Sequence, residues 1–407
     1  MQIRKLGTWE EKLKADRVLA VAFLHDWNEE EARKKRMDEA SADTEPEEEI
    51  WASFDDAGKM MAAISTVRKE MFFDGKSYPV GEVHMVGSLP EGRESGNIRR
   101  LMREVLLDFR RRGDLLSVLI PFNFSFYRKF GFDLIQCNLS QRAAVSQFAG
   151  FMPSLKVSQL SGEDEIVEMK ELFRRFASGY NLSEIKKEDH WRYRGNGEIG
   201  ERDWMNKDRE KYTYLFRDDI GALRGYVSFI FIFKDNPFIG EMNVCELVYD
   251  SPEALKSIFG FIYRMRAKMT HVNFDLPLDM DLAFMLPDCG GVERTHEGHF
   301  MARLLDVKRT LMNMKHPDGK GTYTVRQKDR FLSEDSAAYR VSYEDGKAVS
   351  VNEIAGDADI YVTSETLCQL CIGSISLKEA EYREGTRIVS NRETLEKVFV
   401  RKSVFIF

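Results

Sequence analysis

One strand–helix–strand unit occurs twice in this chain of 407 residues. The first copy covers residues 82–121, and the second is the stretch 243–279, "NVCELVYDSPEALKSIFGFIYRMRAKMTHVNFDLPLD". A chain of this length is too long to fold around one hydrophobic core, and an internal repeat indicates two related domains. Each copy therefore predicts two strands joined by a helix that packs on their sheet.

The helix of the first copy is marked by an apolar stripe at helical spacing. Its members are Ile98, Leu101, Met102, Val105 and Phe109. Arginines at 110–112 fill the last turn, and Gly113 follows where a glycine commonly ends a helix. The continuously apolar run "LLSVLIP" (115–121) then predicts a buried strand.

The segments around the repeat have patterns of their own. Residues 10–40 show helical periodicity, and the acidic stretch 43–49 predicts an exposed loop. Residues 51–86 predict four strands, at 51–54, 60–68, 70–73 and 80–86, with hairpin turns at "DDAGK" and "DGK".

The last hundred residues predict a different arrangement. A helix is expected at 306–314, a strand–turn–strand at 338–351, and helices at 364–371 and 392–399. The chain ends in "SVFIF" (403–407), and we expect this apolar tail to pack into the fold, because most termini are polar and mobile.

Charge and composition exclude several classes of function. The formal net charge is −7 and no basic stripe appears, so we expect no nucleic-acid partner. No apolar run of about 18 residues is present, so no membrane span is expected. Five scattered cysteines predict a reduced, cytoplasmic protein, and the lone pair Cys368 and Cys371 is read as two core thiols rather than a zinc site. We expect no metal.

The junction between strand and helix in the first copy is the strongest candidate site. A strand that ends at Val86–Ser88 and a helix that starts near Gly96 leave the first N–H groups of that helix without partners. These groups and the helix dipole favour an anion, and Arg93 could add charge-assisted hydrogen bonds. The alternative is an ordinary capped helix after a surface loop. The second copy enters its helix through Pro252 and has no comparable loop.

Three stretches resemble one known family. They are "VGSLPEGRESGNIRRLM" (86–102), "LIPFNFSFYRKFGFDL" (119–134) and "HFMARLLDVKRTL" (299–311). In this order they are similar to the enhanced intracellular survival (Eis) family of GNAT N-acetyltransferases. The resemblance implies an α+β fold with tandem GNAT (acyl-CoA N-acyltransferase) domains followed by a sterol-carrier-protein-like α/β domain. The implied division is 1–150 with the acetyl-CoA loop, 151–303 as a degenerate GNAT domain, and 304–407 ending in the active site.

The same resemblance implies acetyl-CoA as cosubstrate and assigns roles to individual residues. Strand residues Val86, Gly87 and Ser88 would pair with the pantetheine arm, and Asn123 would contact the cofactor from the neighbouring strand. The pyrophosphate would lie on Arg93, Glu94, Ser95, Gly96, Asn97 and Ile98, although Glu94 stands where the family usually has a basic residue. Tyr127 matches the family's general acid, and the C-terminal carboxylate of Phe407 matches its base.

The implied reaction is acetyl transfer to a primary amine of a cationic small molecule, aminoglycoside- or polyamine-like, or of lysine. The family also forms hexamers. Two alternatives stay open: a non-catalytic relative that binds acetyl-CoA, motivated by Glu94, and a lipid carrier that works through residues 305–407. For the two catalytic candidates the alternatives are a buried aromatic at Tyr127 and the end of an edge strand at Phe407.

Overall fold

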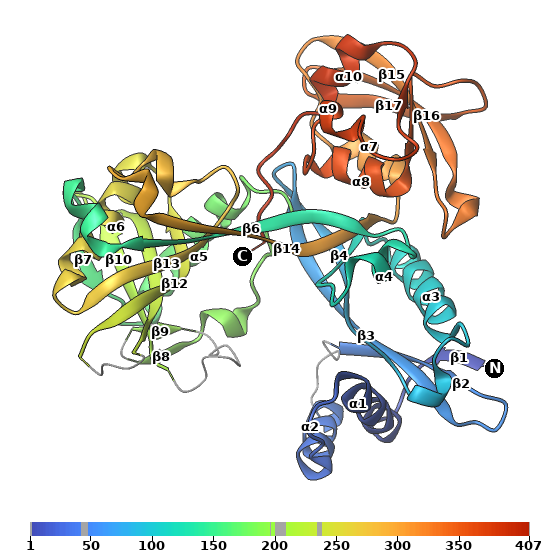
Figure 1. Ribbon diagram of the computed structural model, residues 1–407, viewed down its shortest axis with the longest axis horizontal. Helices are drawn as coiled ribbons and strands as arrows, with labels where there is room; N and C mark the ends of the chain where they lie inside the picture. Colours follow the sequence, from blue (N-terminus) through green and yellow to red (C-terminus); the bar gives the residue numbers. More distant parts are fainter. Residues whose placement is uncertain (1, 42–47, 196, 200–208, 234–237, 407) are drawn as a thin grey trace. The chain divides into compact units, whose positions relative to one another are not determined.

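The computed structural model describes residues 2–41, 48–195, 197–199, 209–233 and 238–406 (Figure 1). Within this part, contacts divide the chain into two compact units. Unit 1 contains residues up to Met71, Ser77–Ile135 and Phe300–Arg401. Unit 2 contains Phe72–Lys76, Gln136–His299 and the residues from Lys402 onward. No described helix is both long and apolar enough to cross a membrane.

The larger sheet of unit 1 carries the first copy of the repeat. Its strand order is β1 (Gln2–Lys5), β2 (Glu48–Phe54), β3 (Met60–Phe73), β4 (Lys76–Ser88), β5 (Leu116–Leu119) and β14 (Val292–Leu304). Helix α3 (Asn97–Arg111) connects β4 to β5, which run parallel. The predicted stripe is confirmed, because Leu101, Met102, Val105 and Phe109 are fully buried. The predicted break near residue 69 is wrong, since β3 runs unbroken to the Asp74–Gly75 turn.

Glycine at position 81 explains how closely α3 approaches the sheet. A Cβ atom on Gly81, in β4, would lie 2.3 Å from Cδ2 of Phe109 in α3. Real Cβ atoms do not approach other carbons so closely, so the helix can pack here only against a residue without a side chain.

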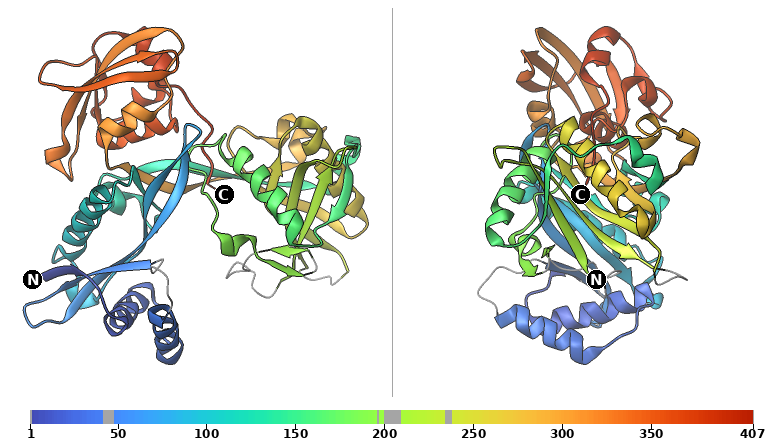
Figure 2. Two further views of the ribbon diagram at one scale, coloured as in Figure 1. Left: turned by 180° about the vertical axis from the view of Figure 1, so that it is seen from behind. Right: turned by 90° about the vertical axis from the view of Figure 1, so that its left-hand side faces the viewer.

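Two helices lie between β1 and β2 in the chain, α1 (Trp9–Phe23) and α2 (Glu29–Ser41), and they lie side by side (Figure 2). Buried Arg36 joins α2 to α1 through Asp16 and to β2 through Glu48. Part of the predicted acidic loop, residues 43–47, lies outside the described residues. Glu48 and Glu49 differ from the prediction because they belong to β2.

Unit 2 is built around the second copy. Its strand order is β6 (Asp133–Ala144), β13 (Met269–Leu276), β12 (Gly240–Tyr249), β11 (Leu223–Ile232), β10 (Lys211–Arg217) and β7 (Lys156–Gln159). Helix α6 (Pro252–Arg264) connects the parallel strands β12 and β13, as the repeat predicts. Helix α5 (Glu163–Ala177) packs on β11 and β12.

The last part of unit 1 forms a five-stranded sheet with four short helices (Figure 2). The strand order is β17 (Lys347–Ile354), β16 (Ala337–Glu344), β15 (Lys320–Lys328), β18 (Ile360–Thr363) and β19 (Arg387–Ile388). The helices are α7 (Val307–Asn313), α8 (Ser364–Ile372), α9 (Leu377–Ala380) and α10 (Arg392–Val398). The expected helices and the β16–β17 hairpin are confirmed, and Cys368 and Cys371 are fully buried in α8.

The C-terminal tail packs into unit 2. Val404 forms an isolated β-bridge with Asn181, and the Phe405 N–H donates to the Asn181 carbonyl at 3.2 Å. The Ile406 N–H donates to Oε1 of Gln136 at 2.7 Å. Phe405 and Ile406 are 5% and 9% exposed, so the prediction of a packed tail is confirmed for them. Phe407 lies outside the described residues.

Candidate active site

The junction after β4 leaves the N-terminus of α3 open. A short 3₁₀ turn, Pro90–Gly92, follows the strand, and the helix begins after Gly96, whose φ of +77° lies in the left-handed region. No side chain caps the first N–H groups, and the first turn contains no acidic residue. All other described helices of nine or more residues have an acidic residue in the first turn. The positive end of the α3 dipole is therefore uncompensated, as an anion site requires.

The loop before α3 is held by its own side chains. Ser95 donates from Oγ to the Gly92 carbonyl at 2.6 Å. Asn97 donates from Nδ2 to Ser95 Oγ at 2.6 Å and to the Gly92 carbonyl at 3.3 Å, and it is buried. Nothing lies within 4 Å of the place where Gly96 would carry a Cβ atom. A rigid loop with open space above its glycine suits the close approach of a ligand to the backbone.

Glu94, one of the residues predicted to hold the pyrophosphate, has an uncommon backbone conformation. Arg93 and Glu94 are both exposed, and Glu94 has a φ of +61°. That conformation is uncommon for a residue with a side chain.

The strands β4 and β5 separate next to the junction. Their described register pairs Val80 with Leu116, Gly81 with Ser117 and Glu82 with Val118, and it ends there. The end of β4, residues 86–88, lies beyond the last pair. A Cβ atom on Gly87 would lie 2.6 Å from Cβ of Ala22, so this glycine lets α1 rest on the strand. In the described register, the edge of β4 that faces β5 therefore has no β5 partner at residues 86–88, while its other edge neighbours β3, and an extended ligand can join such an edge by backbone hydrogen bonds.

The general-acid candidate lies in the short helix α4 (Phe124–Arg128) after β5. Asn123 caps this helix, since its Oδ1 accepts from the Phe126 N–H at 3.0 Å and from the Ser125 hydroxyl at 2.7 Å. Tyr127 is 4% exposed and packs edge-on against Phe122 and Phe126. Burial raises the pKa of Tyr127, so its hydroxyl carries a proton across the physiological range.

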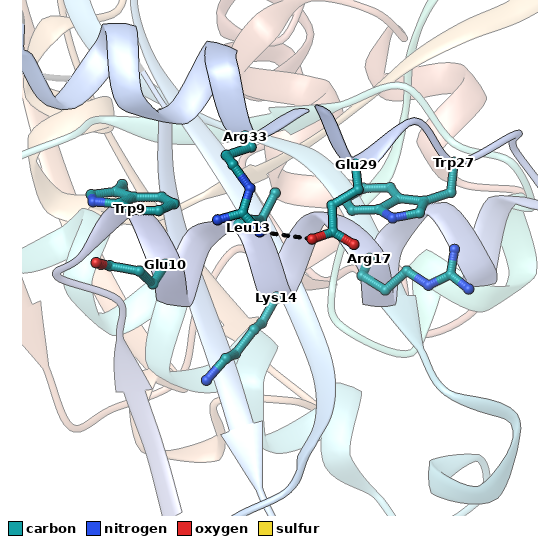
Figure 3. Close-up of a pocket in the computed structure, with 8 residues that line it drawn as sticks. All are labelled: Trp9, Glu10, Leu13, Lys14, Arg17, Trp27, Glu29 and Arg33. Atoms are coloured by element: carbon teal, nitrogen blue, oxygen red, sulfur yellow. Dashed lines mark hydrogen bonds and ion pairs between the residues drawn. The ribbon is translucent and has the colours of Figure 1, made fainter. Parts of the chain in front are cut away.

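A pocket of about 490 Å³ lies between α1 and α2 (Figure 3). Its lining residues are Trp9, Glu10, Leu13, Lys14, Arg17, Trp27, Glu29 and Arg33. Arg33 pairs with Glu29 at 2.8 Å and lies over the Trp9 ring, while Arg17 lies over the Trp27 ring. The pocket combines two indole rings, three cations and two carboxylates. Sequence reasoning missed it, and the tryptophans near the two ends of the first helix, Trp9 and Trp27, were the available signal.

The second copy has no such opening. Ser251 caps α6 by accepting the Ala254 N–H at 3.2 Å, Pro252 occupies the first turn, and Glu253 compensates the dipole. The residues proposed to hold the cofactor and Tyr127 thus all come from unit 1. The tail before Phe407 belongs to unit 2.

Comparisons with known proteins identify the domains of the chain. Two family profiles, each described as an acetyltransferase (GNAT) domain, match residues 3–135 and 185–304, and together they span more than half of the chain. No curated protein matches the chain by sequence.

Several solved structures share the fold over its whole length. A protein of unknown function from Enterococcus faecalis V583, described as a probable N-acyltransferase, superposes with a TM-score of 0.80 at 18% identity, covering 100% of this chain and 98% of its own. A GCN5-related N-acetyltransferase from Anabaena variabilis gives 0.81 at 15% identity, with coverage of 100% and 99%. Eis1 from Mycobacterium abscessus gives 0.76 at 18%, with coverage of 100% and 98%. The chain therefore belongs to the GNAT acetyltransferases and is an N-acetyltransferase with two GNAT domains and an Eis-like fold.

Proposed function

We propose that the chain transfers the acetyl group of acetyl-CoA to a primary amine, with the cofactor's pyrophosphate bound at the N-terminus of α3. The observation that carries this proposal is the open, uncapped and acid-free first turn of that helix. Arg93, Glu94, Ser95, Gly96, Asn97 and Ile98 surround the pyrophosphate. The pantetheine arm pairs with Val86, Gly87 and Ser88 where β4 has left β5, and Asn123 lies at the start of the neighbouring helix.

Acetyl transfer needs one proton removed and one supplied. The neutral amine attacks the thioester carbonyl, the C–N bond forms, the C–S bond breaks, and the thiolate leaves. Tyr127 gives its proton to this thiolate, and its raised pKa keeps the proton available until the leaving group forms. The α-carboxylate of Phe407 accepts the proton that the amine nitrogen loses as the C–N bond forms, directly or through water. A terminal carboxylate is a weak base, with an ordinary pKa of about 3.3–3.7, so it acts by position rather than strength.

The acceptor in this proposal is a cationic small molecule, aminoglycoside- or polyamine-like, or a lysine side chain. The pocket between α1 and α2 does not support this choice, because Arg33 and Arg17 already lie over its two indole rings and Arg33 pairs with Glu29. Lys14, Arg17 and Arg33 line the same pocket and oppose a high positive charge.

The domain organisation and the oligomeric state are also part of the proposal. Residues 304–407 form the sterol-carrier-protein-like domain, residues 151–303 the degenerate GNAT domain, and residues 1–150 the catalytic one. The protein forms a hexamer in the cytoplasm, where its five cysteines, none of them in a disulfide, stay reduced. Mass photometry of the purified protein tests the hexamer directly.

The test of the reaction is the loss of thioester absorbance near 232 nm with a panel of primary amines. Thiol reagents are unsuitable for this assay, because Cys245 and Cys289 are exposed and would react with them. We expect turnover with at least one amine. Calorimetry would distinguish the two ways to fail: cofactor binding without any turnover would favour a non-catalytic relative, and no binding would reject the site itself.

A further inference from the structure

A buried arginine lies directly beneath the helix that carries Tyr127. Arg303, in β14, is 1% exposed, and its Nη1 donates to the Phe130 carbonyl at 2.7 Å. Its Nη2 pairs with Asp329, which is also buried. The Phe130 N–H in turn donates to the Tyr127 carbonyl at 2.9 Å. One guanidinium therefore connects the turn that ends α4 to the last third of the chain; we name Arg303, the Phe130 carbonyl and Asp329 the Arg303 bridge.

Gly131 shows how tightly this bridge is built. A Cβ atom there would lie 1.9 Å from Nη1 of Arg303, and the residue has a φ of +80°. Both the space and the backbone conformation require glycine. Gly131, the glycine in "FYRKFGF", therefore lies where the guanidinium of Arg303 packs against the backbone.

Asp329 extends the bridge into the core around Tyr127. Its Oδ1 accepts the N–H groups of Phe331 and Leu332, each at 2.8 Å. The Phe331 ring packs edge-on against Phe130 with centroids 5.4 Å apart. Phe331 and Leu332 belong to the same hydrophobic cluster as Tyr127. A single carboxylate therefore fixes both the arginine and the aromatic residue that covers the end of α4.

We propose that Arg303 and Asp329 are positioning residues for Tyr127, and this inference rests on the proposed role of Tyr127 as general acid. Helix α4 has only five residues, and so short a helix does not hold its shape alone. The bridge fixes its C-terminal turn, and with it the direction of the Tyr127 hydroxyl. Arginine suits this place because its planar fork presents Nη1 and Nη2 in fixed directions to two acceptors, whereas lysine has one nitrogen on a flexible stem.

The test is a double-mutant cycle of Arg303→Lys and Tyr127→Phe, measured as kcat and KM for acetyl-CoA. We expect Arg303→Lys alone to lower kcat about tenfold, because small misplacements of a reacting group are costly, with KM for acetyl-CoA within about twofold. In the Tyr127→Phe background the same change should alter kcat less than about twofold, since residues that act as a unit are not additive. A purely structural role would lower kcat equally in both backgrounds and would overturn the inference.

Two further variants keep the test decisive. Arg309→Lys is the matched control, because Arg309 donates to the Gly113 carbonyl at the far end of α3, and its kcat should stay within about twofold of wild type. Phe331→Leu probes the bridge if Arg303→Lys does not fold, since it keeps an apolar residue in the core but removes the ring on Phe130. It should show the same dependence on Tyr127. If Tyr127→Phe itself leaves kcat unchanged, the proposed function fails; if it lowers kcat and the changes add, only the positioning role fails.

Discussion

Glu94 is the residue that most clearly opposes an anion at the open end of α3. Its carboxylate is exposed on the loop that is proposed to hold the pyrophosphate, and its φ is +61°. Replacing it with glutamine removes the charge and keeps both the side-chain length and the backbone conformation. Any change in cofactor affinity then reports the charge alone.

The size of the effect follows from Coulomb's law. At a separation of about 8 Å in water, removing the repulsion of two phosphate charges tightens binding about fivefold. At 0.15 M salt the Debye length is about 8 Å, which reduces this gain to about twofold. The gain should vanish near 1 M salt, where charges at this distance are fully screened.

Isothermal titration calorimetry of coenzyme A at low and at high salt measures this gain in affinity and its dependence on salt. Glu253→Gln is the matched control, because it removes the same charge from the first turn of α6, where Ser251 already caps the helix. We expect the control to leave the dissociation constant unchanged. Weaker binding in Glu94→Gln, or a gain that does not depend on salt, would refute the argument that the pyrophosphate lies beside this loop.

Four further predictions concern chemistry and stability. Tyr127→Phe should lower kcat about 10²–10³-fold, as loss of a general acid does, with an unchanged thermal midpoint by circular dichroism; a smaller loss would remove Tyr127 from the mechanism. Because burial raises the pKa of Tyr127, the pH profile of kcat should show no fall caused by this residue below pH 10, and a descending limb near pH 8 that disappears in Tyr127→Phe would contradict this. Arg36→Met should cost about 3–5 kcal/mol in urea unfolding, since it leaves Asp16 and Glu48 without their buried partner. Burial raises the pKa of Glu48, but Ser65 and Arg36 outweigh it and lower the pKa overall, so its contribution to stability is present above about pH 4.5 and should be lost as the pH falls further in wild type.

The sequence predicted features whose causes are local. The apolar stripe of α3, its glycine end at Gly113, and the strand–turn–strand at 338–351 depend on neighbouring residues, and all three are confirmed. The missing cap at Gly96 was not predictable, because Ser95 and Asn97, both common cap residues, flank it, and in the structure Asn97 donates to Ser95 and Ser95 to the Gly92 carbonyl instead. The false break in β3 had a local cause too, since the run of charged residues near Lys69 interrupts the strand pattern without ending the strand.

Features that depend on distant residues were not predictable. Gly131 has a clear role only when Arg303 is in place, 172 positions later in the chain. The pocket between α1 and α2 depends on how these two helices pack against each other, and helical periodicity does not determine that packing. The roles of the individual cofactor and catalytic residues, Phe407 among them, remain predictions.

A crystal structure with coenzyme A bound tests the central claim most directly. We predict pyrophosphate oxygens within about 3.2 Å of the backbone nitrogens that begin α3, at Asn97 and Ile98, and the cofactor thiol within hydrogen-bond reach of the Tyr127 hydroxyl. A cofactor whose phosphates lie elsewhere in the protein, with the first turn of α3 facing solvent, would contradict the account.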